Sequence, residues 1–313
     1  RLAFTISKYN PELDAAPHDE TYRLDVTRGM TVLDALIRIK DEQEGRLTFR
    51  YSCRSAICGS CAMTINGAEK LACRTAVRRE WERHGGIRVE PLRNLPVLKD
   101  LAVDMRSFWG KVRAIDPWVQ AESAAAGGSA QFHNVDACIM CGACVAACTT
   151  HEVSKGFLGP AALAKADRFL SDPRELESAK MDRLQILERA NGMWDCTRCN
   201  MCVQVCPKDV KPMEAIIRLR RGAIQRGLTS TEGARHVTGF TEIIEREGRL
   251  NEAVMPLKVI GTNPVRLLRV IPLGLKMLLK GKVPSPFGHA LPGIEQIRAI
   301  FAVFRRRKRP VHP

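Results

Sequence analysis

The chain has 313 residues, which is enough for two domains with separate hydrophobic cores. Its hydrophobic content of 45% and charged content of 27% are ordinary for a globular protein, whereas twelve cysteines and a net charge of +15 are not. No run of about 18 apolar residues occurs, which excludes a membrane-spanning helix. No apolar stretch with a cleavage site stands at the start of the given sequence, so we expect no secretory signal there, and disulfide frameworks are typical of small secreted chains. We therefore expect the cysteines to bind metal in a reducing compartment.

The positive charge is concentrated toward the C-terminal end. Residues 211–313 contain 20 Lys and Arg against 7 Asp and Glu, a net of +13, which leaves +2 for residues 1–210. Such a segment suits an anionic membrane surface or an acidic protein. The basic run at 304–310 (FRRRKRP) has no aromatic residues interleaved among its basic ones, so nucleic acid is not an expected partner.

The N-terminal part predicts a small α+β domain. Alternating residues at 2–8 and 21–27 predict two strands joined by a loop. A helix is predicted over 31–43, because apolar residues recur there at helical spacing after Thr31, a suitable N-cap. Short strands are expected at 61–65, 70–73 and 86–92. This order fits a plant-type ferredoxin (β-grasp) domain, which we place at residues 1–118.

The rest of the chain predicts helices, which makes the whole protein α+β. Small residues at 122–131 (ESAAAGGSAQ) predict a flexible linker, placed at 119–133. An all-α domain follows at 134–226, and a basic helical extension for docking on a partner or a membrane surface occupies 227–313. Helical patterns cover 159–172, 180–192 and 212–227, and the extension is expected to be broken at Pro264, Pro272, Pro284, Pro286 and Pro292.

The cysteines form three groups of four: Cys53, Cys58, Cys61 and Cys73, then Cys138, Cys141, Cys144 and Cys148, then Cys196, Cys199, Cys202 and Cys206. The first group has the C-x4-C-x2-C spacing and distant fourth cysteine that are typical of plant-type [2Fe–2S] proteins. Its loop contains Gly59, as expected where backbone N–H groups wrap a cluster. Zinc sites normally use two close cysteine pairs, and this group has only one.

The second and third groups share the spacing C-x2-C-x2-C-x3-C. In bacterial two-cluster ferredoxins, the fourth cysteine of such a run ligates the other cluster. We therefore predict that Cys138, Cys141 and Cys144 share one [4Fe–4S] cluster with Cys206. The second [4Fe–4S] cluster is predicted on Cys196, Cys199, Cys202 and Cys148. Pro207 follows the bacterial pattern, whereas Thr149 after Cys148 departs from it.

Three clusters imply transfer of single electrons. The sequence contains no dinucleotide-binding G-x-G-x-x-G after a strand, no P-loop, and no evident Ser/His/Asp or paired-carboxylate arrangement. We predict no catalytic residue on this chain, so two-electron chemistry is expected to take place on a partner.

The segment 51–73 (YSCRSAICGSCAMTINGAEKLAC) closely resembles the iron–sulfur subunits of succinate dehydrogenase and fumarate reductase. The resemblance runs to about residue 220, through LPVLKDLAVDM (95–105), IDPWV (115–119), CIMCGAC (138–144), FLGPAALAKADRFLSDPRE (157–175) and VCPKDVKPMEAI (205–216). It implies a subunit that docks on an FAD-containing flavoprotein interconverting succinate and fumarate. Electrons would pass on to a quinone-reactive, membrane-associated partner, and the complex would lie peripherally on the cytoplasmic face of the inner or cell membrane.

Departures from the family leave the electron acceptor open. Mainstream members lack a cysteine at the position of Cys199 and carry [3Fe–4S] there, so Cys199 implies a second [4Fe–4S] cluster, with [3Fe–4S] as the alternative. Thr149 and Thr197 replace residues that border the quinone in mainstream members, so no quinone site is carried over. The pattern resembles a less common branch with a cysteine-rich partner, and the tail beyond about 227 resembles heterodisulfide-reductase iron–sulfur subunits.

Two alternative functions follow. The same flavoprotein partner and clusters could exchange electrons with a thiol/disulfide couple, as in a thiol:fumarate or heterodisulfide-reductase-like complex. A free-standing ferredoxin-type carrier is the other alternative, which the length and the basic tail disfavour. Residues 267–282 (LLRVIPLGLKMLLKGK) have leucines on one face and basic residues elsewhere. That pattern predicts either an interfacial helix or a helix packed on a partner subunit.

Overall fold

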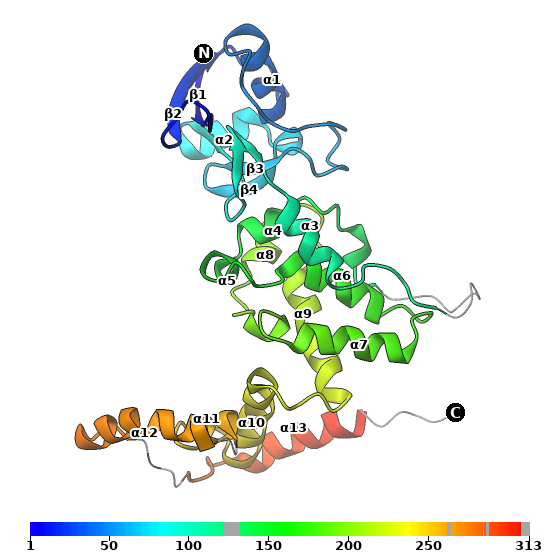
Figure 1. Cartoon of the computed structure of the whole chain (residues 1–313), viewed down its shortest axis with the longest axis vertical. Coiled ribbons are helices and arrows are strands. Elements are labelled where there is room, and N and C mark those ends of the chain that lie inside the picture. Colours follow the sequence, from blue (N-terminus) through cyan, green and yellow to red (C-terminus); the bar gives the residue numbers. More distant parts are fainter. Residues whose placement is uncertain (122–131, 262–263, 284, 286–287, 308–313) are drawn as a thin grey trace. The chain divides into compact units, whose positions relative to one another are not determined.

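The computed structural model describes residues 1–121, 132–261, 264–283, 285 and 288–307 (Figure 1). The stretch 122–131 that was predicted as flexible lies outside these residues, as do Pro284 and Pro286. The chain divides into two compact units, Arg1–Gly222 and Ala223–Pro313.

The N-terminal part of the first unit is built on a five-stranded mixed sheet with the order β2-β1-β5-β3-β4. Its strands are β1 (Leu2–Lys8), β2 (His18–Leu24), β3 (Ala62–Ile65), β4 (Ala68–Leu71) and β5 (Ile87–Glu90). β1 is antiparallel to β2 and parallel to β5, whereas β3 is antiparallel to both of its neighbours. Phe4 and Ile6 of β1 are fully buried, so the period-two pattern of the sequence selects the face that carries the core.

Helix α1 (Val32–Glu42) confirms the helix predicted over 31–43 and its N-cap. The Thr31 hydroxyl accepts a hydrogen bond from the Asp34 N–H (3.2 Å), and the Asp34 carboxylate accepts one from the Thr31 N–H (3.0 Å). This reciprocal capping box satisfies two N–H groups that the first turn leaves without helical partners. Val32, Leu33, Leu36 and Ile39 of the predicted stripe are buried, whereas Ile37 is partly exposed.

Two predicted strands differ in extent. β2 begins at His18 rather than at residue 21, because its pairing with β1 continues to the end of that strand, where Lys8 lies opposite His18. The strand predicted at 70–73 ends at Leu71, because Ala72–Arg74 form a 3₁₀ turn that carries Cys73 out of the sheet.

The sequence did not predict helices α2 (Val77–His84) and α3 (Arg106–Arg113), nor the hairpin of β6 (Val97–Lys99) and β7 (Ala102–Val103). α2 offers only two apolar residues, Val77 and Trp81, since five of its eight residues (VRREWERH) are Arg or Glu. A tertiary contact stabilises it instead: Glu80 is buried and accepts hydrogen bonds from Lys70 Nζ (2.8 Å) and Asn66 Nδ2 (3.2 Å).

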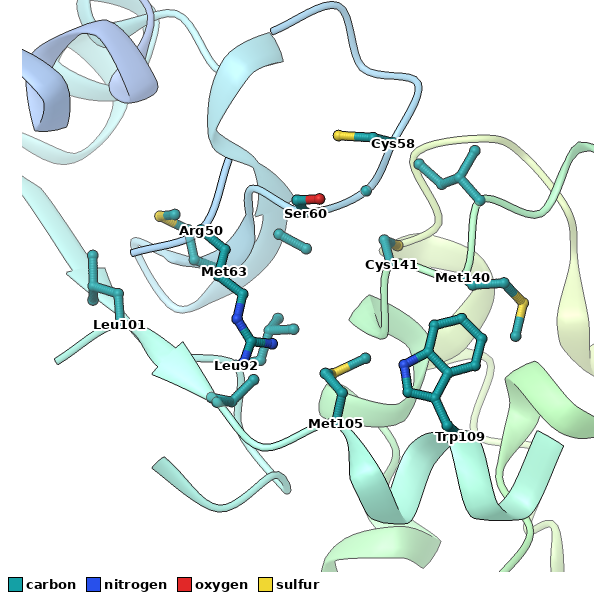
Figure 2. A pocket seen from close by; sticks show the side chains of 14 residues that line it. Arg50, Cys58, Ser60, Met63, Leu92, Leu101, Met105, Trp109, Met140 and Cys141 are labelled. Atoms are coloured by element: carbon teal, nitrogen blue, oxygen red, sulfur yellow. The ribbon is translucent and has the colours of Figure 1, made fainter. Parts of the chain in front are cut away.

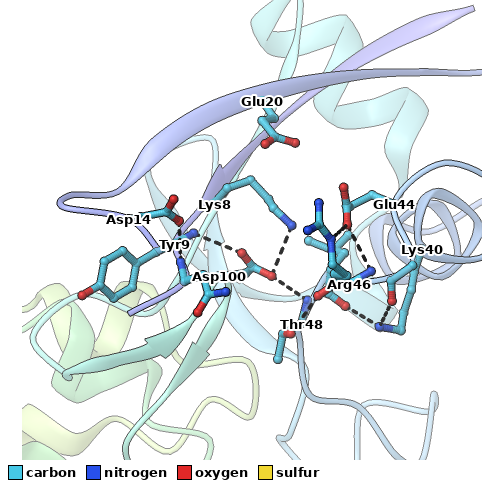
Figure 3. Close-up of polar contacts among 12 residues, drawn as sticks. Lys8, Tyr9, Asp14, Glu20, Lys40, Glu44, Arg46, Thr48 and Asp100 are labelled. Carbon is cyan, nitrogen blue, oxygen red and sulfur yellow. Dashed lines mark hydrogen bonds and ion pairs between the residues drawn. The ribbon is translucent and has the colours of Figure 1, made fainter. Parts of the chain in front are cut away.

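Asp100 links three segments of the N-terminal part (Figure 3). Its carboxylate accepts hydrogen bonds from the N–H groups of Tyr9 (3.0 Å) and Thr48 (2.8 Å) and lies 3.3 Å from Lys8 Nζ. Asp100 is 2% exposed and Lys8 is 8% exposed, so water barely screens the ion pair. Because Thr48 leads into the segment that carries Cys53, Asp100 fixes the base of the first cysteine loop.

The remainder of the first unit is helical. Its helices are α4 (Ala143–Ala146), α5 (Thr149–Val153), α6 (Pro160–Leu170), α7 (Glu177–Glu188), α8 (Met201–Gln204) and α9 (Pro212–Gln225). The helices predicted at 159–172, 180–192 and 212–227 are confirmed. Arg183 of α7 is fully buried and pairs with Glu175 (2.5 Å). It also donates hydrogen bonds to the carbonyl oxygens of Ile115 and Asp116, so it fastens the segment around residues 115–116 to the helical part.

The second unit consists of α10 (Glu232–Glu247), α11 (Val254–Ile260), α12 (Pro264–Leu279) and α13 (Ile294–Arg307) (Figure 1). α10 packs against α11 and α13. Pro272 was expected to break the helix but lies inside α12, where it removes one backbone hydrogen bond and its ring crowds the carbonyl of the preceding turn. Pro264 starts α12, a position at which proline needs no N–H partner. No helix in the described ranges is long and apolar enough to cross a bilayer.

Candidate iron–sulfur sites

The first cysteine group lies on an irregular loop between α1 and β3, with Cys73 on the turn after β4. Backbone N–H groups in this loop point at sulfur. Those of Ile57 and Cys58 donate to Cys53 Sγ (both 3.3 Å), and that of Ala56 donates to Cys73 Sγ (3.3 Å). Such donors stabilise negative charge on the sulfurs, as an iron–sulfur site requires.

The same loop is held in an uncommon backbone conformation. Arg54 and Ala56 both have a φ of 56°, a region that residues with a β-carbon seldom occupy.

The thiols of the first cysteine loop occupy different environments. A hydrogen bond from the Ser60 hydroxyl lowers the pKa of Cys58 to about 6, whereas burial raises the pKa of Cys61 to about 12. These directions agree with their exposure, since Cys58 is exposed at the rim of the site and Cys61 is buried at its base.

The second and third groups fold as a structural repeat. Met140 and Gly142 have φ values of 54° and 84°, and Arg198 and Asn200 at the equivalent places have 59° and 67°. In each loop the second of these residues precedes a short helix, α4 or α8, and the two helices pack together. The repeated cysteine spacing is thus also a repeat of backbone conformation.

One cavity is lined by Cys138, Cys141 and Cys144 together with Cys206, which belongs to the other repeat. Most other residues around it are apolar. Burial raises the pKa of Cys141 to about 11 and that of Cys144 well above its ordinary value, and the neighbouring thiols add to both shifts. Thiolates are costly in such a place unless a positive metal centre compensates them.

Cys148 lies in turn among the thiols of Cys196, Cys199 and Cys202. Burial raises the pKa of Cys202 to about 12, and the charges of the other three thiols add to the rise. Cys199 is the exposed member of this set. Burial alone would raise its pKa, but hydrogen bonds, led by the one from the Thr149 hydroxyl (3.5 Å), lower it.

The arrangement of these thiols fits a cluster better than a single ion. Across the described residues, no group of three or more His, Cys, Asp or Glu side chains is placed to hold one metal ion. A tetrahedral zinc ion with bonds of ~2.3 Å would bring its thiols within about 3.8 Å of one another. Cys138, Cys141, Cys144 and Cys206 instead surround a cavity, as ligands do when each binds a different iron atom.

The first cysteine loop lies against the second (Figure 2). Beside their contact lies a cavity of about 280 Å³, with Cys58 and Met63 on one side and Met105, Trp109 and Cys141 on the other. At the wall of this cavity, Gly59 approaches Cys141 so closely that an added β-carbon would lie 2.9 Å from Cys141 Cβ. The structure therefore brings the two loops into direct contact.

A buried arginine supports the third group. Arg220 of α9 is 6% exposed and donates to the carbonyl oxygens of Met193 (2.6 Å), Trp194 (3.0 Å) and Cys196 (2.7 Å). Burial lowers its pKa, although a guanidinium remains charged at neutral pH. Sequence reasoning did not single out Arg220, since it is one of several basic residues in α9 and only the packing shows which one turns inward.

Two family matches cover these parts of the chain. Residues 3–110 match the family described as "2Fe-2S iron-sulfur cluster binding domain", and residues 134–210 match "4Fe-4S dicluster domain". With the mixed sheet and the helical part, these matches define an α+β iron–sulfur protein with a plant-type and a two-cluster ferredoxin domain. This fold class is the one predicted from the order of elements.

The chain is similar to iron–sulfur subunits of known enzymes. It is 39% identical over 238 residues to the fumarate reductase iron-sulfur subunit of Mycobacterium tuberculosis, covering 73% of this chain and 95% of the relative. With the corresponding subunit of Escherichia coli O6:H1 it is 40% identical over 224 residues, or 69% and 90%. A chain of the apo Mycobacterium smegmatis Sdh1 complex matches with a TM-score of 0.60 and 25% identity, covering 72% and 96%.

This chain belongs to the family of iron–sulfur subunits of fumarate reductase and succinate dehydrogenase, as its segment 51–73 indicated. It is accordingly an electron-transfer subunit of an oxidoreductase, with a [2Fe–2S] domain and a [4Fe–4S] domain.

Proposed function

We propose that this chain carries electrons between an FAD-containing flavoprotein, where succinate and fumarate are interconverted, and a quinone-reactive, membrane-associated partner. When bound, each cluster takes up and releases one electron at a time. The observation that carries the proposal is the direct packing of the first cysteine loop on the second, through Gly59 and Cys141. Such packing keeps neighbouring redox centres close without any bridging side chain.

We propose the following ligands. Cys53, Cys58, Cys61 and Cys73 hold the [2Fe–2S] cluster; Cys138, Cys141, Cys144 and Cys206 hold one [4Fe–4S] cluster; Cys148, Cys196, Cys199 and Cys202 hold the other. Three observations support the assignment: the N–H groups directed at sulfur in the first loop, the shared cavity of the second set, and the mutual proximity of the third.

The third cluster is proposed as [4Fe–4S] rather than [3Fe–4S], with Cys199 as the fourth ligand. Its sulfur lies near those of Cys148 and Cys202 and accepts a hydrogen bond from Thr149. A lowered pKa favours the thiolate form that binds iron.

The exposed rim of the first loop is the proposed docking site for the flavoprotein. Ile57 is 64% exposed beside Cys58, and Tyr51 is exposed nearby with the Arg54 guanidinium over its ring at 5.4 Å. An apolar and aromatic rim of this kind suits a protein interface. The chain as a whole is proposed to lie peripherally on the cytoplasmic face of the inner or cell membrane.

A second candidate function keeps the same flavoprotein and clusters, but its terminal electron acceptor is a thiol/disulfide couple held by a cysteine-rich partner. One local observation favours it. The Thr149 hydroxyl donates a hydrogen bond to Cys199 Sγ, and Thr149 stands at the position where residues of mainstream members are expected to border the quinone. The helical second unit, which follows the matched ferredoxin domains, provides a further surface for such a partner.

Purification of the complex from its native cell tests both candidates. A co-purifying flavoprotein with succinate–dye activity is expected, and its absence would refute them together. Reduction of a quinone but not of disulfides supports the first candidate, and the reverse supports the second. Electron paramagnetic resonance of the oxidised protein tests the third cluster separately, because oxidised [3Fe–4S] is paramagnetic whereas oxidised [2Fe–2S] and [4Fe–4S] are silent. A stoichiometric oxidised signal would overturn the proposal for Cys199.

A further inference from the structure

Helix α12 exposes a continuous apolar face. Its members are exposed by more than half and are spaced three or four residues apart along most of the helix: Leu268 (64%), Ile271 (54%), Leu275 (58%), Leu278 (63%) and Leu279 (82%). None of the residues of α12 is buried. Exposed apolar patches of this extent normally mark a surface that something else covers. These five residues are called the apolar face of α12 below.

The opposite side of α12 is basic. Arg269, Lys276 and Lys280 follow one another at helical spacing on that side, just as the leucines do on the other. Arg266 lies there as well and pairs with Glu232. The sequence contains no Asp or Glu between Glu252 and Glu295, whereas it contains Lys258, Arg266, Arg269, Lys276, Lys280 and Lys282.

We propose that α12 lies in the surface of an anionic lipid bilayer, with its apolar face among the acyl chains and Arg269, Lys276 and Lys280 reaching lipid phosphates. A wide apolar face opposite Lys and Arg is the arrangement that interfacial helices adopt. The long aliphatic stems of these basic residues let their charges reach the headgroups while the helix backbone lies deeper. The inference rests on the peripheral membrane location within the proposed function and assigns that location to one segment.

The composition of α12 favours lipid over a protein partner. The centres of protein–protein interfaces are enriched in aromatic residues, and α12 contains none. The unbroken positive sign from 253 to 294 matches a surface whose negative charge is continuous, as an anionic bilayer provides. Three apolar residues, Val270, Leu273 and Met277, depart from the pattern, because helical spacing places them nearer the basic side.

Vesicle flotation with the full-length, cluster-loaded chain tests the proposal. Binding is expected to vesicles that contain phosphatidylglycerol, to weaken with added salt, and to be much weaker with phosphatidylcholine alone. Leu275→Gln should weaken binding about tenfold or more, the effect of keeping one leucine out of the apolar phase. Leu273→Gln is the matched control, because Leu273 belongs to the same helix, is similarly exposed (61% against 58%) and lies on the basic side.

The proposal fails if the chain binds no vesicle, if both vesicle types bind equally, or if the two leucine variants lose binding equally. It also fails if Leu275→Gln releases a protein subunit while vesicle binding is unchanged. The visible absorbance of the clusters checks that each variant keeps its first unit. Electron transfer from the flavoprotein is measured separately in detergent solution, so a failure on vesicles leaves the proposed electron transfer intact.

Discussion

Gly59 of the first cysteine loop lies against Cys141 of the second, with no room for a side chain between them. A β-carbon on Gly59 would lie 2.9 Å from Cys141 Cβ, 3.0 Å from Cys141 Cα and 3.0 Å from the carbonyl oxygen of Ile139. Two of these three atoms belong to the backbone of the second loop, so they cannot move aside as the end of a flexible side chain does. The separation of the two loops therefore depends on the absence of a side chain at position 59.

Gly59→Ala should push the two loops apart. We expect a loss of about 1–3 kcal/mol of stability from the forced contact, added to the strain of an alanine at a φ of +75°. Magnetic coupling between the two reduced clusters, measured by electron paramagnetic resonance, should weaken because it depends on their distance. Gly67→Ala is the matched control, since Gly67 has the same φ of +75° with no atom within 4 Å. Equal effects in the two variants would contradict this account.

Cys199→Ser should change the third cluster alone. Because Cys199 is the exposed thiol of its set and the other three are retained, partial ligation is expected to survive, with iron lost from the Cys199 corner. The oxidised variant should gain a paramagnetic signal of the [3Fe–4S] type that the wild-type protein lacks. Unchanged iron content and an unchanged spectrum would remove Cys199 from the proposed ligands.

Cys206→Ser tests the exchange of ligands between the repeats. Although Cys206 follows Cys202 closely in the sequence, it lines the cavity of Cys138, Cys141 and Cys144. The variant should therefore alter the spectrum of the cluster that Cys199→Ser leaves intact. If both variants perturb the same signal, each cysteine run holds its own cluster and the exchange is wrong.

Arg220→Gln should lower the reduction potential of the third cluster. The substitution removes a buried positive charge beside Cys196 and leaves carbonyl oxygens without a charged donor. Since an added electron is then less well compensated, we expect a fall of about 59 mV or more, which is tenfold in the equilibrium constant for one electron. Unsatisfied carbonyls should also cost about 1–3 kcal/mol.

Potentiometric titration followed by electron paramagnetic resonance measures the shift, and chemical denaturation measures the stability. Arg221→Gln provides the control, because Arg221 is the next residue of α9 and its side chain is exposed. It removes the same charge in a place where water already screens it. A similar potential in both arginine variants would mean that Arg220 acts on packing alone.

Asp100→Asn should destabilise the N-terminal part by about 3–5 kcal/mol, because it leaves the buried Lys8 ammonium without its counter-charge. The base of the first cysteine loop should loosen as well, since one acceptor for Tyr9 or Thr48 is lost. Denaturation midpoints and the rate of loss of the [2Fe–2S] absorbance give the two readouts. Asp19→Asn is the control: its ion pair with Arg88 is exposed on both sides and is expected to contribute ~0–1 kcal/mol. Equal losses in both variants would show that burial of the Lys8 pair is irrelevant.

The amino-acid sequence by itself determined the class of protein. Cysteine spacing is a local property, and a loop must have a particular length and glycine content to wrap a cluster, so 51–73 and the repeated C-x2-C-x2-C-x3-C runs carry that information directly. The helix at 31–43 was predictable for the same reason, because its cap and its apolar stripe lie within one short segment. The bounds of β2 were not predictable, because they depend on its pairing with β1. The existence of α2 was not predictable either, because it depends on the buried contact between Glu80 and Lys70.

Only the tertiary structure decided which residues support the sites. Arg220 and its neighbours in α9 are alike in sequence, and packing alone turns one of them toward Cys196. Gly59 could be assigned to a cluster loop from the sequence, yet its contact with Cys141 joins residues far apart in the chain. Asp100 likewise bonds to segments near residues 8 and 48 that no local pattern connects. The spacing of cysteines within one short segment can be read directly from the sequence. Buried charges and close backbone approaches arise only when distant segments pack together.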